Sequence, residues 1–425
     1  MNIEKYISYI QNGGLDGAFS KLYSNCELAR KRYIVNLNDY KAIFGDTETL
    51  QLFSAPGRTE IGGNHTDHQQ GCVLAAALNV DVIGVAAERN DNIVQVKSSG
   101  HNMDTITLSE LAPVNSEAGH AAALIRGMCA RLYELGYNIG GFDAHTTSDV
   151  LGGSGMSSSA AFEVLIGTII SHLFNNGKID PITIAKCGQY AENVYFEKPS
   201  GLMDQMACSV GGFVGIDFFE KDTPAVERVD FDFDSTAHSL CIVNTGGSHA
   251  DLTYEYADVL NEMRSVANFF GKPVLSLVAA ADIINNAAKL RHDFGDRAVL
   301  RAMHFVKDTE RAVLEKKALQ NGDFGEFLQH IRASGYSSFM YLQNIYSTSS
   351  VKEQGLSLAL CLSENVLSGA GAYRVHGGGF GGTIQAFVPQ GLLEEYRRVM
   401  DSTFGDNACQ ILNVRQYGGI SLEKI

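Results

Sequence analysis

The sequence predicts an α+β protein made of two closely packed domains. Its 425 residues suggest two or three domains, since a domain holds roughly 100–200 residues. Segments with helical spacing of apolar residues occur along the chain together with short strand-like runs. A polar segment at 221–224 marks the approximate boundary, so we expect one domain over 1–222 and a second over 223–425. With only seven prolines, no proline-rich linker separates them.

The first domain is expected to begin with helices and to continue as a sheet. Two amphipathic stretches, 3–10 and 17–33, stand on either side of Asn12, Gly13 and Gly14. Strand-like runs follow at 72–76, 80–87 and 93–98, separated by Gly, Asn and Asp. Further helices are predicted over 118–135, 160–174 and 182–195, and further strands over 140–147 and 212–218.

The second domain is expected to be mostly helical at first and mixed at its end. A strand is predicted over 226–233, and residues 250–345 have a mainly helical pattern. The last part reads as a helix at 356–367, a strand at 383–388, a helix at 392–403 and a strand at 409–413. No internal repeat or low-complexity tract is visible in the sequence.

Charge and cysteine content exclude several classes of protein. The net charge is −15 and no run of Lys and Arg occurs, so we expect no nucleic-acid partner. The eight cysteines form no C-x-x-C pair, which makes a zinc site improbable and fits a reducing compartment. The first residues lack the apolar core of a signal peptide, and no apolar run reaches the roughly 20 residues of a membrane helix. We therefore expect a soluble cytoplasmic protein with no membrane partner.

The strongest local signal is a glycine- and serine-rich loop at 152–159, between a predicted strand and an apolar helix. Its glycines allow close approach of the backbone to a ligand, and the helix start offers free N–H groups and a positive dipole end to an anion. The serine hydroxyls suit phosphate oxygens or a metal ion. The loop lacks the G-x-x-x-x-G-K-[ST] pattern and the spacing of a dinucleotide fingerprint. It predicts a phosphate site; a plain Gly/Ser connection is the alternative.

Three further clusters of polar residues and glycines accompany this loop. Residues 55–68 hold Arg58, Asp67 and other directional polar groups that suit a polyhydroxylated ligand, or else form a surface turn. In 199–208, Asp204 lies among apolar neighbours and would need a cation such as Arg58 to stay ionised, unless it is only a helix cap. In 374–383, five glycines among six residues permit close approach to a ligand or form a simple hairpin. A zinc pair of His65 and His68 is a weak alternative because no partners lie nearby.

In this order, the four clusters resemble the signatures of the GHMP small-molecule kinases, and among these of the galactokinase family. The matching stretches are Gly57-Arg58 with His65-Thr66-Asp67, then 153–160, then Gly201-Leu202-Met203-Asp204-Gln205, and finally 377–382. The resemblance covers nearly the whole chain. It implies a ribosomal-S5-like N-terminal domain and a ferredoxin-like C-terminal domain, with ATP and a sugar in the cleft between them.

The resemblance also implies roles for individual residues. Arg58 and Asp204 would be catalytic, with Asp204 contacting the anomeric hydroxyl. The phosphates of ATP would lie against Gly153, Ser154, Gly155, Met156, Ser157, Ser158 and Ser159. A serine of the triplet, Ser159, would hold Mg²⁺ together with Glu192. The sugar would be bound by Asn64, His65, Asp67, Gly201, Tyr256, Gly378 and Gly379.

Some residues depart from the family pattern. Glu60 stands where the family has Asn, Asn64 where it has Glu, and His68 where it has Tyr. The stretch 257–260 also differs from the usual Asn-x-Arg-Arg. The expected activity is phosphorylation of D-galactose at its anomeric hydroxyl, giving galactose 1-phosphate and ADP. The departures keep open a kinase for another hexose, a sugar acid or an N-acetylhexosamine, and a sugar sensor without kinase activity. The oligomeric state is open, with a monomer favoured.

Overall fold

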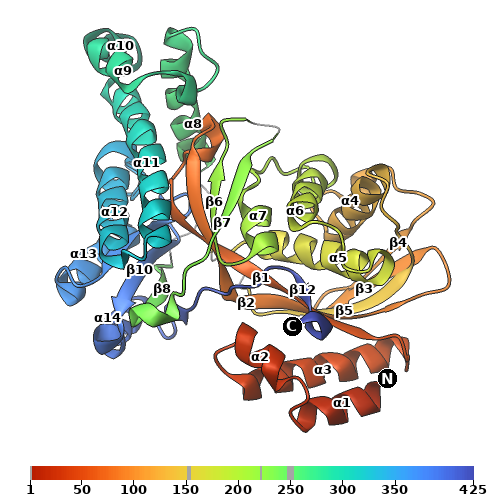
Figure 1. Ribbon diagram of the computed structural model, residues 1–425. Coiled ribbons are helices and arrows are strands. Elements are labelled where there is room, and N and C mark those ends of the chain that lie inside the picture. The colour runs from red at the N-terminus through yellow and green to blue at the C-terminus, as the bar shows by residue number, and fades with distance from the viewer. Residues whose placement is uncertain (1, 151–154, 221–222, 247–252) are drawn as a thin grey trace.

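The computed structural model describes residues 2–150, 155–220, 223–246 and 253–425, and contains two β-sheets flanked by helices (Figure 1). The larger sheet has eight strands in the order β12-β1-β2-β5-β3-β4, with β6 paired to β2 and β7 paired to β6. These strands are β1 (Gln51–Gly62), β2 (Cys72–Glu88), β3 (Ile93–Ser98), β4 (Met103–Thr107), β5 (Phe142–Ser148), β6 (Phe213–Asp217), β7 (Ala225–Val229) and β12 (Ile420–Ser421).

Strand β2 pairs with different strands along its two halves. One half pairs with β6 and the other with β5, and β1 runs antiparallel beside it. The sequence predicts two separate runs here, which is wrong because the strand continues unbroken through Asn79. The side-chain oxygen of Asn79 accepts the backbone N–H of Asn413 at 2.8 Å, and the Asn79 N–H donates to the Asn413 carbonyl at 3.1 Å. The polar residue is thus paired with a distant segment instead of ending the strand.

Helices cover both faces of the larger sheet, α1–α3 on one side and α4–α7 on the other (Figure 1). An apolar core lies between α5 and strands β1 and β2. The bounds are α1 (Ile3–Gln11), α2 (Asp16–Leu22), α3 (Cys26–Phe44), α4 (Ala121–Glu134), α5 (Ser158–Asn175), α6 (Pro181–Tyr190) and α7 (Met203–Val210). The predicted helices at 118–135, 160–174 and 182–195 are confirmed, the last with a π-helical end at Ala191–Tyr195.

The single helix predicted over 17–33 is wrong, because the helix is interrupted between α2 and α3. Tyr23 is extended, and its hydroxyl donates to the buried Asp81 carboxylate at 2.6 Å. The Asn25 side chain then accepts the N–H groups of Glu27 and Leu28, both at 3.0 Å, and so starts the next helix. A tertiary hydrogen bond and a local cap together override the amphipathic pattern.

The second part of the molecule combines the smaller antiparallel sheet, in the order β11-β8-β10-β9, with helices α8–α14. Its strands are β8 (His238–Asn244), β9 (Ala372–His376), β10 (Thr383–Pro389) and β11 (Cys409–Leu412). Helices α13 and α14 pack on this sheet, and α12 packs on β9. The helices are α8 (Thr253–Phe269), α9 (Ala280–Asn285), α10 (Ala287–Phe294), α11 (Asp296–Gln320), α12 (Phe324–Ser337), α13 (Gly355–Leu367) and α14 (Leu393–Phe404).

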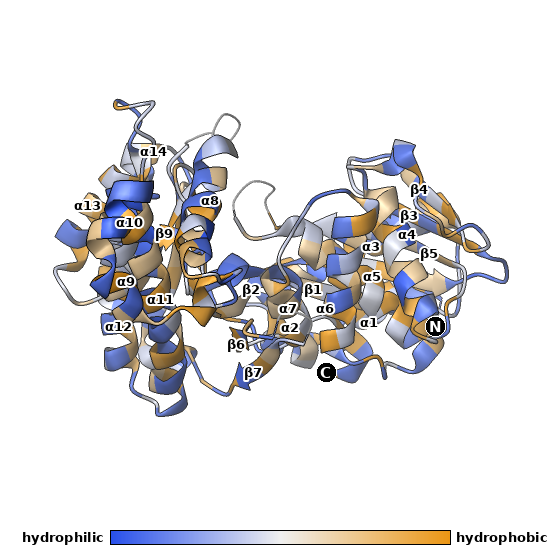
Figure 2. Cartoon of the chain, turned by 90° about the horizontal axis from the view of Figure 1, so that it is seen from above, coloured by the Kyte–Doolittle hydropathy of each residue, from blue (hydrophilic) through white to orange (hydrophobic). Residues whose placement is uncertain are grey.

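Seen from above, helices α9–α14 lie on one side and α3–α6 on the other, with β1, β2 and β6 between them (Figure 2). The two parts are joined by more than one segment. Strands β7 and β12 both pair with the larger sheet, although they follow residue 222, and α11 packs against β2. One apolar core runs through both parts and includes Phe53, Phe213, Phe327 and Phe387. The division at 222 stays a prediction. No helix in the described ranges is long and apolar enough to cross a membrane.

Candidate active site

The centre of the candidate site is an ion pair between Arg58 on β1 and Asp204 in the first turn of α7. The Arg58 Nε lies 2.8 Å from Asp204 Oδ1, and the side chains are only 10% and 30% exposed. The hydroxyl of Ser157 donates to the other carboxylate oxygen, Oδ2, at 2.5 Å. The Arg58 guanidinium also donates to the carbonyl of Gly155, and its backbone N–H donates to Met156 O at 3.1 Å. Arg58 therefore fixes Asp204 and the glycine–serine loop to one another, as the sequence predicts for the Arg–Asp pair.

The environment of Asp204 keeps its carboxyl group ionised. Burial alone would raise its pKa, but the charge of Arg58 and the hydrogen bonds from Arg58 and Ser157 outweigh burial and lower the pKa below its usual value. Asp204 is not the cap of α7, since Leu202 occupies that position. The carboxylate is thus presented as an acceptor rather than used to start a helix.

The described part of the glycine–serine loop leads directly into α5. Gly155 and Ser157 both have positive φ, 75° and 55°, and this tight backbone places the start of α5 beside the Arg58–Asp204 pair. A Cβ on Gly155 would lie 3.1 Å from His376 Cε1, so the loop runs close against β9. The side chain of Met156 is fully buried. Gly153 and Ser154 lie outside the described residues.

A second group of oxygens lies at the start of α5. The Ser159 hydroxyl donates to Glu192 Oε1 at 3.0 Å, and Lys198 Nζ donates to the same oxygen at 2.6 Å. Glu192 is 2% exposed, and its other oxygen accepts Gln205 Nε2 at 2.9 Å. A hydroxyl and a carboxylate are hard donors that suit Mg²⁺, which is usually held by one or two protein groups together with phosphates and water. No cluster of three or more His, Cys, Asp or Glu side chains that could hold a metal occurs in the described ranges, so the zinc alternative gains no support.

Asp67 and Gly201 form the edge of the site next to Asp204. Asp67 follows β1 in a 3₁₀ turn, Asp67–Gln69, and a Cβ on Gly201 would lie 2.9 Å from Asp67 Oδ2. Burial raises the pKa of Asp67; nearby Asp204 raises it further, and His65 opposes the rise. Two carboxyl groups with pKa values moved in opposite directions therefore share one small region.

His65 and Tyr256 approach the glycine-rich turn 377–382, which joins β9 to β10. A ring nitrogen of His65 lies 2.9 Å from Gly378 O, and the Tyr256 hydroxyl donates to Gly379 O at 2.9 Å. Their rings are stacked with centroids 6.4 Å apart. A Cβ on Gly378 would lie 2.4 Å from Tyr256 Cε1, so only glycine permits this approach. The glycine cluster is a hairpin connection, and it is also tied to the site.

Asn64 lies behind the same turn, fully buried. Its amide nitrogen donates to Glu60 Oε1 at 3.0 Å and to Gly377 O at 2.8 Å. Its side-chain oxygen accepts Asn344 Nδ2 at 2.8 Å, and the same Asn344 nitrogen donates to Gly378 O at 3.0 Å. The amide of Asn64 is thus already bonded to protein groups. Its direct contact with a ligand stays a prediction.

Arg374 and Asp308, which lie around Asn64, were not singled out as site residues from the sequence. Arg374 donates to Glu60 Oε1 at 2.7 Å, with both side chains buried. From α11, the Asp308 carboxylate accepts the Asn64 N–H at 2.8 Å. These partners stand 244 to 314 residues apart in the chain, so no local pattern could have paired them. The only signal was the position of Arg374 beside the glycine cluster.

Two buried histidines complete the surroundings. His376 lies between the hydroxyls of Thr59 and Thr383, at 3.0 and 2.9 Å, and burial lowers its pKa to about 3. Burial also lowers the pKa of His68 to about 3, with smaller effects from His65 and Arg264. Both ring nitrogens of His68 are buried without a hydrogen-bond partner among the described residues. Both imidazoles are therefore neutral at physiological pH.

The sequence is similar to those of galactokinases and other GHMP kinases. Residues 38–88 match a family model described as the galactokinase galactose-binding signature, and residues 123–212 match the GHMP kinase N-terminal domain. The chain is 26% identical to galactokinase of Clostridium tetani over 384 residues, which is 89% of this chain and 94% of that one. It is 28% identical to galactokinase of Streptomyces coelicolor, with 86% and 91% covered.

Solved structures show the same fold. Lactococcus lactis galactokinase complexed with galactose superposes with a TM-score of 0.74 at 23% identity, covering 90% of this chain and 98% of that one. A mevalonate kinase superposes with a TM-score of 0.59 at 14% identity, covering 85% and 99%. The predicted two-domain α+β fold of the GHMP kinases is confirmed.

Proposed function

We propose that the protein phosphorylates D-galactose at its anomeric hydroxyl with ATP, giving galactose 1-phosphate and ADP. The chain belongs to the galactokinase family of the GHMP kinases and is therefore a phosphotransferase that acts on a sugar hydroxyl. The observation that carries this proposal is the ion pair of Arg58 and Asp204, which Ser157 connects to the start of α5. The Asp204 carboxylate, which can bind the acceptor hydroxyl, therefore lies beside the N-terminus of α5, which can bind an anion.

In this proposal Asp204 accepts a hydrogen bond from the anomeric hydroxyl and directs its oxygen at the phosphorus. Each of its oxygens already accepts one hydrogen bond, and an ionised carboxylate has further lone pairs to offer. The lowered pKa makes Asp204 a weak base in bulk terms. Phosphoryl transfer passes through a loose transition state, so orientation and charge neutralisation matter more than early proton removal. The hydroxyl proton goes to Asp204 as the bond to phosphorus forms.

The ATP phosphates are expected at the N-terminus of α5. The helix start supplies free backbone N–H groups, and Ser157, Ser158 and Ser159 supply hydroxyls. Arg58 faces the same loop through Gly155 O and offsets negative charge on the transferred group. The predicted roles of Gly153, Ser154, Gly155 and Met156 would be met by their backbone in the same loop.

Ser159 and Glu192 would hold Mg²⁺, whose bound charge offsets that of the phosphates. Two protein oxygens 3.0 Å apart fit an ion that takes its other ligands from phosphate and water. Gln205 holds Glu192 from behind, and Lys198 contributes a second positive charge at the same carboxylate.

The sugar is expected between the Asp67–Gly201 edge and the glycine turn. Asp67 would accept hydrogen bonds from sugar hydroxyls, each strengthened by its charge. His65, Tyr256, Gly378 and Gly379 would form the opposite wall. In this arrangement Asn64 acts through Gly377 and Asn344, and its contact with the sugar stays part of the proposal.

A kinase for another sugar is the second candidate. Two observations favour it: the amide of Asn64 is fully engaged with protein, and the neutral His68 has two buried nitrogens without a partner in the described chain. A ring that can both donate and accept would suit a sugar hydroxyl or an N-acetyl group better than a carboxylate.

Incubation of the purified protein with MgATP and a sugar panel tests both candidates. The panel holds D-galactose, D-glucose, D-galacturonate and N-acetyl-D-galactosamine, and ADP release is measured for each. We expect turnover with D-galactose above the rest. Preference for another member supports the second candidate. Sugar binding without ADP release from any member would overturn both and support a sensor.

The cellular compartment, the partners and the oligomeric state are part of the same proposal. All eight cysteines are free, which fits a reducing compartment such as the cytoplasm. The expected partners are the sugar and ATP, and we propose that the protein works as a monomer.

A further inference from the structure

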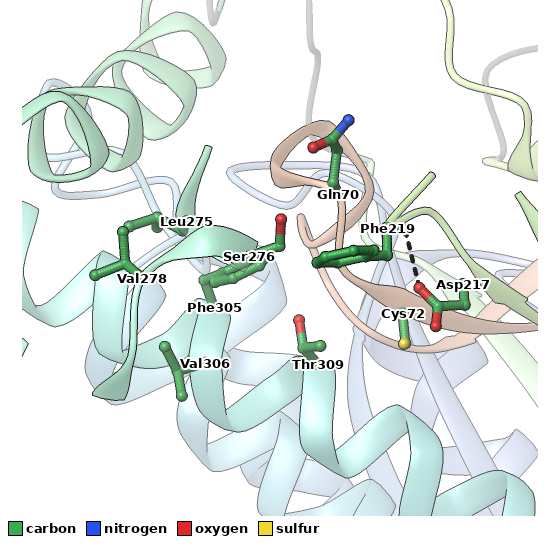
Figure 3. Close-up of a pocket in the computed structure, with 10 residues that line it drawn as sticks. All are labelled: Gln70, Cys72, Asp217, Phe219, Leu275, Ser276, Val278, Phe305, Val306 and Thr309. Atoms are coloured by element: carbon green, nitrogen blue, oxygen red, sulfur yellow. Dashed lines mark hydrogen bonds between the residues drawn. The ribbon is translucent and has the colours of Figure 1, made fainter. Parts of the chain in front are cut away.

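A separate cavity is lined by Gln70, the residue that follows the Asp67–Gln69 turn. It has a volume of about 280 Å³ and is formed by the end of that turn, the end of β6, the short η5 helix (Leu275–Leu277) and one face of α11 (Figure 3). We call it the turn pocket, and its key residues are Gln70, Asp217, Phe219, Ser276, Phe305 and Thr309. None of them belongs to the site described above.

Two hydroxyl groups of the turn pocket are buried and unpaired. Ser276 Oγ and Thr309 Oγ1 have no hydrogen-bond partner among the described residues. Figure 3 shows both directed into the space bounded by the Phe219 ring and Gln70. Buried polar groups in folded proteins are normally satisfied, and a pair of hydroxyls aimed into one cavity marks a place where a hydroxylated ligand can bind.

The opposite wall is aromatic. Phe219 is 50% exposed although it is a large apolar side chain, whereas Phe305, which also lines the cavity, is 2% exposed. Ligand sites combine such apolar walls with a few polar groups that fix orientation. An aromatic face beside hydroxyl, amide and carboxylate groups fits a sugar ring, which has C–H groups on its faces and hydroxyls at its rim.

The charge of the lining excludes an anionic ligand. Asp217 contributes a carboxylate, and no lysine, arginine or histidine lines the cavity in the part of the chain that the structure describes. A phosphate or a sugar acid would face repulsion from this carboxylate. A neutral monosaccharide remains the best match in size, polarity and charge.

The turn pocket and Asp67 are connected through a single backbone turn. The backbone N–H of Gln70 donates to Asp67 O at 3.0 Å, and Gln69 Oε1 accepts the N–H of Leu275 at 3.0 Å. A Cβ on Gly71 would lie 2.4 Å from Thr309 Oγ1, so the turn packs closely against α11 at this point. Asp67 at the candidate site and Gln70 at the pocket are thus joined by one backbone hydrogen bond.

We propose that the turn pocket binds a second molecule of neutral monosaccharide and, through the turn 67–71, changes the affinity of the active site for its sugar. Binding in the pocket stands on the cavity alone; only the coupling rests on the proposed function. Because a ligand held by Thr309 and Gln70 restrains the turn, it stabilises the position of Asp67.

Equilibrium dialysis of the full chain against radiolabelled D-galactose, without ATP, tests the pocket. We expect two sugars per chain. Thr309→Val, which removes the hydroxyl and keeps the shape, should weaken the second site about tenfold or more, whereas Thr309→Ser should retain it. Inorganic phosphate should not compete. One sugar per chain that Thr309→Val leaves in place overturns the inference.

Initial rates test the coupling separately. The wild type should show a non-hyperbolic dependence of rate on D-galactose, and Thr309→Val should restore a simple hyperbola with turnover at saturation unchanged. Two bound sugars with hyperbolic kinetics in the wild type would overturn the coupling and keep the site. If D-galactose binds once and Thr309→Val abolishes that binding, the pocket is supported, while the proposal that the active site takes galactose fails.

Discussion

At the scale of single residues, Arg58 determines how the candidate site is built. Its side chain bonds Asp204 and Gly155, and its backbone bonds Met156, so β1, α7 and the loop before α5 meet at one guanidinium. The Arg–Asp pair could be predicted from the sequence, because a buried acid needs a cation. The Glu60–Arg374 pair could not, since its partners are 314 residues apart and neither stands in an apolar run.

Asp204→Asn should lower kcat by about 100- to 10,000-fold, the range of a lost acid–base or orienting group. Arg58 would keep an amide partner, so we expect little loss of folded structure. The measurement is kcat and KM with D-galactose beside the circular dichroism spectrum. Asp406→Asn, at an exposed position, is the matched control and should be unchanged. Full activity in Asp204→Asn would remove this residue from the mechanism.

The pH dependence follows from the lowered pKa of Asp204. A folded-state pKa below the unfolded value stabilises the fold at pH values above the unfolded pKa, and this stabilisation is lost as the pH falls through the folded-state pKa. The wild type should therefore exceed Asp204→Asn in stability at neutral pH, and the difference should shrink as the pH falls through the lowered pKa of Asp204. Urea unfolding at a series of pH values checks this; a difference that grows on acidification contradicts it.

Glu192→Gln should raise the Mg²⁺ concentration needed for half-maximal activity by about tenfold or more. A tenfold change corresponds to about 1.4 kcal/mol of binding free energy. The neutral amide keeps the shape but loses the charge beside Ser159. Rates at saturating ATP and sugar over a Mg²⁺ series measure the shift. Glu353→Gln, an exposed change, serves as the control. An unaltered Mg²⁺ dependence would place the metal elsewhere.

At the scale of elements, the glycine turn is rigid because it is held from outside. Asn64 and Asn344 bond the carbonyls of Gly377 and Gly378, and Phe380 N–H donates to Asn344 O at 2.5 Å. Sequence patterns gave most helices correctly, because apolar periodicity is local. They missed the break at Tyr23 and the continuity through Asn79, because both depend on hydrogen bonds to distant segments.

Asn344→Ala should raise KM for the sugar several-fold with a smaller change in kcat. It removes the donor that Asn64 Oδ1 and Gly378 O now share, and leaves them Ser338 Oγ at 3.3 Å and a His65 ring nitrogen at 2.9 Å, so we expect a cost of about 0.5–1.5 kcal/mol. Steady-state kinetics and thermal unfolding measure the two effects. Asn365→Ala, exposed on α13, is the control. An unchanged KM in Asn344→Ala would show that the turn does not need this support.

At the scale of the whole molecule, the C-terminal segment returns to the first sheet and holds both parts together. Asp81 on β2 pairs with Arg32 of α3 at 2.8 Å and with Arg415 at 3.1 Å, all at buried or nearly buried positions. The order of motifs indicated the two-domain fold. It could not show that residues beyond 222 supply strands to the larger sheet, because such pairing depends on contacts distant in sequence.

Asp81→Asn should destabilise the protein by about 3–5 kcal/mol, because the fully buried Arg415 loses its counter-charge and Arg32 keeps only Asp149. Urea unfolding at neutral pH measures the change. Asp91→Asn removes a pair with Arg89 in which the Asp91 side chain is 47% exposed, so its loss of stability should be much smaller. Equal losses for the two variants would mean that burial of the Asp81 pair adds nothing.

The position of the new phosphate on the product tests the central claim most directly. After incubation of the wild type with MgATP and D-galactose, a ³¹P–¹H correlation spectrum identifies the carbon that carries the phosphate. The proposed function, in which Asp204 accepts the anomeric hydroxyl beside Arg58 and Ser157, predicts coupling of phosphorus to the anomeric proton. A phosphate on any other carbon, or no sugar phosphate at all, would contradict this assignment of the site.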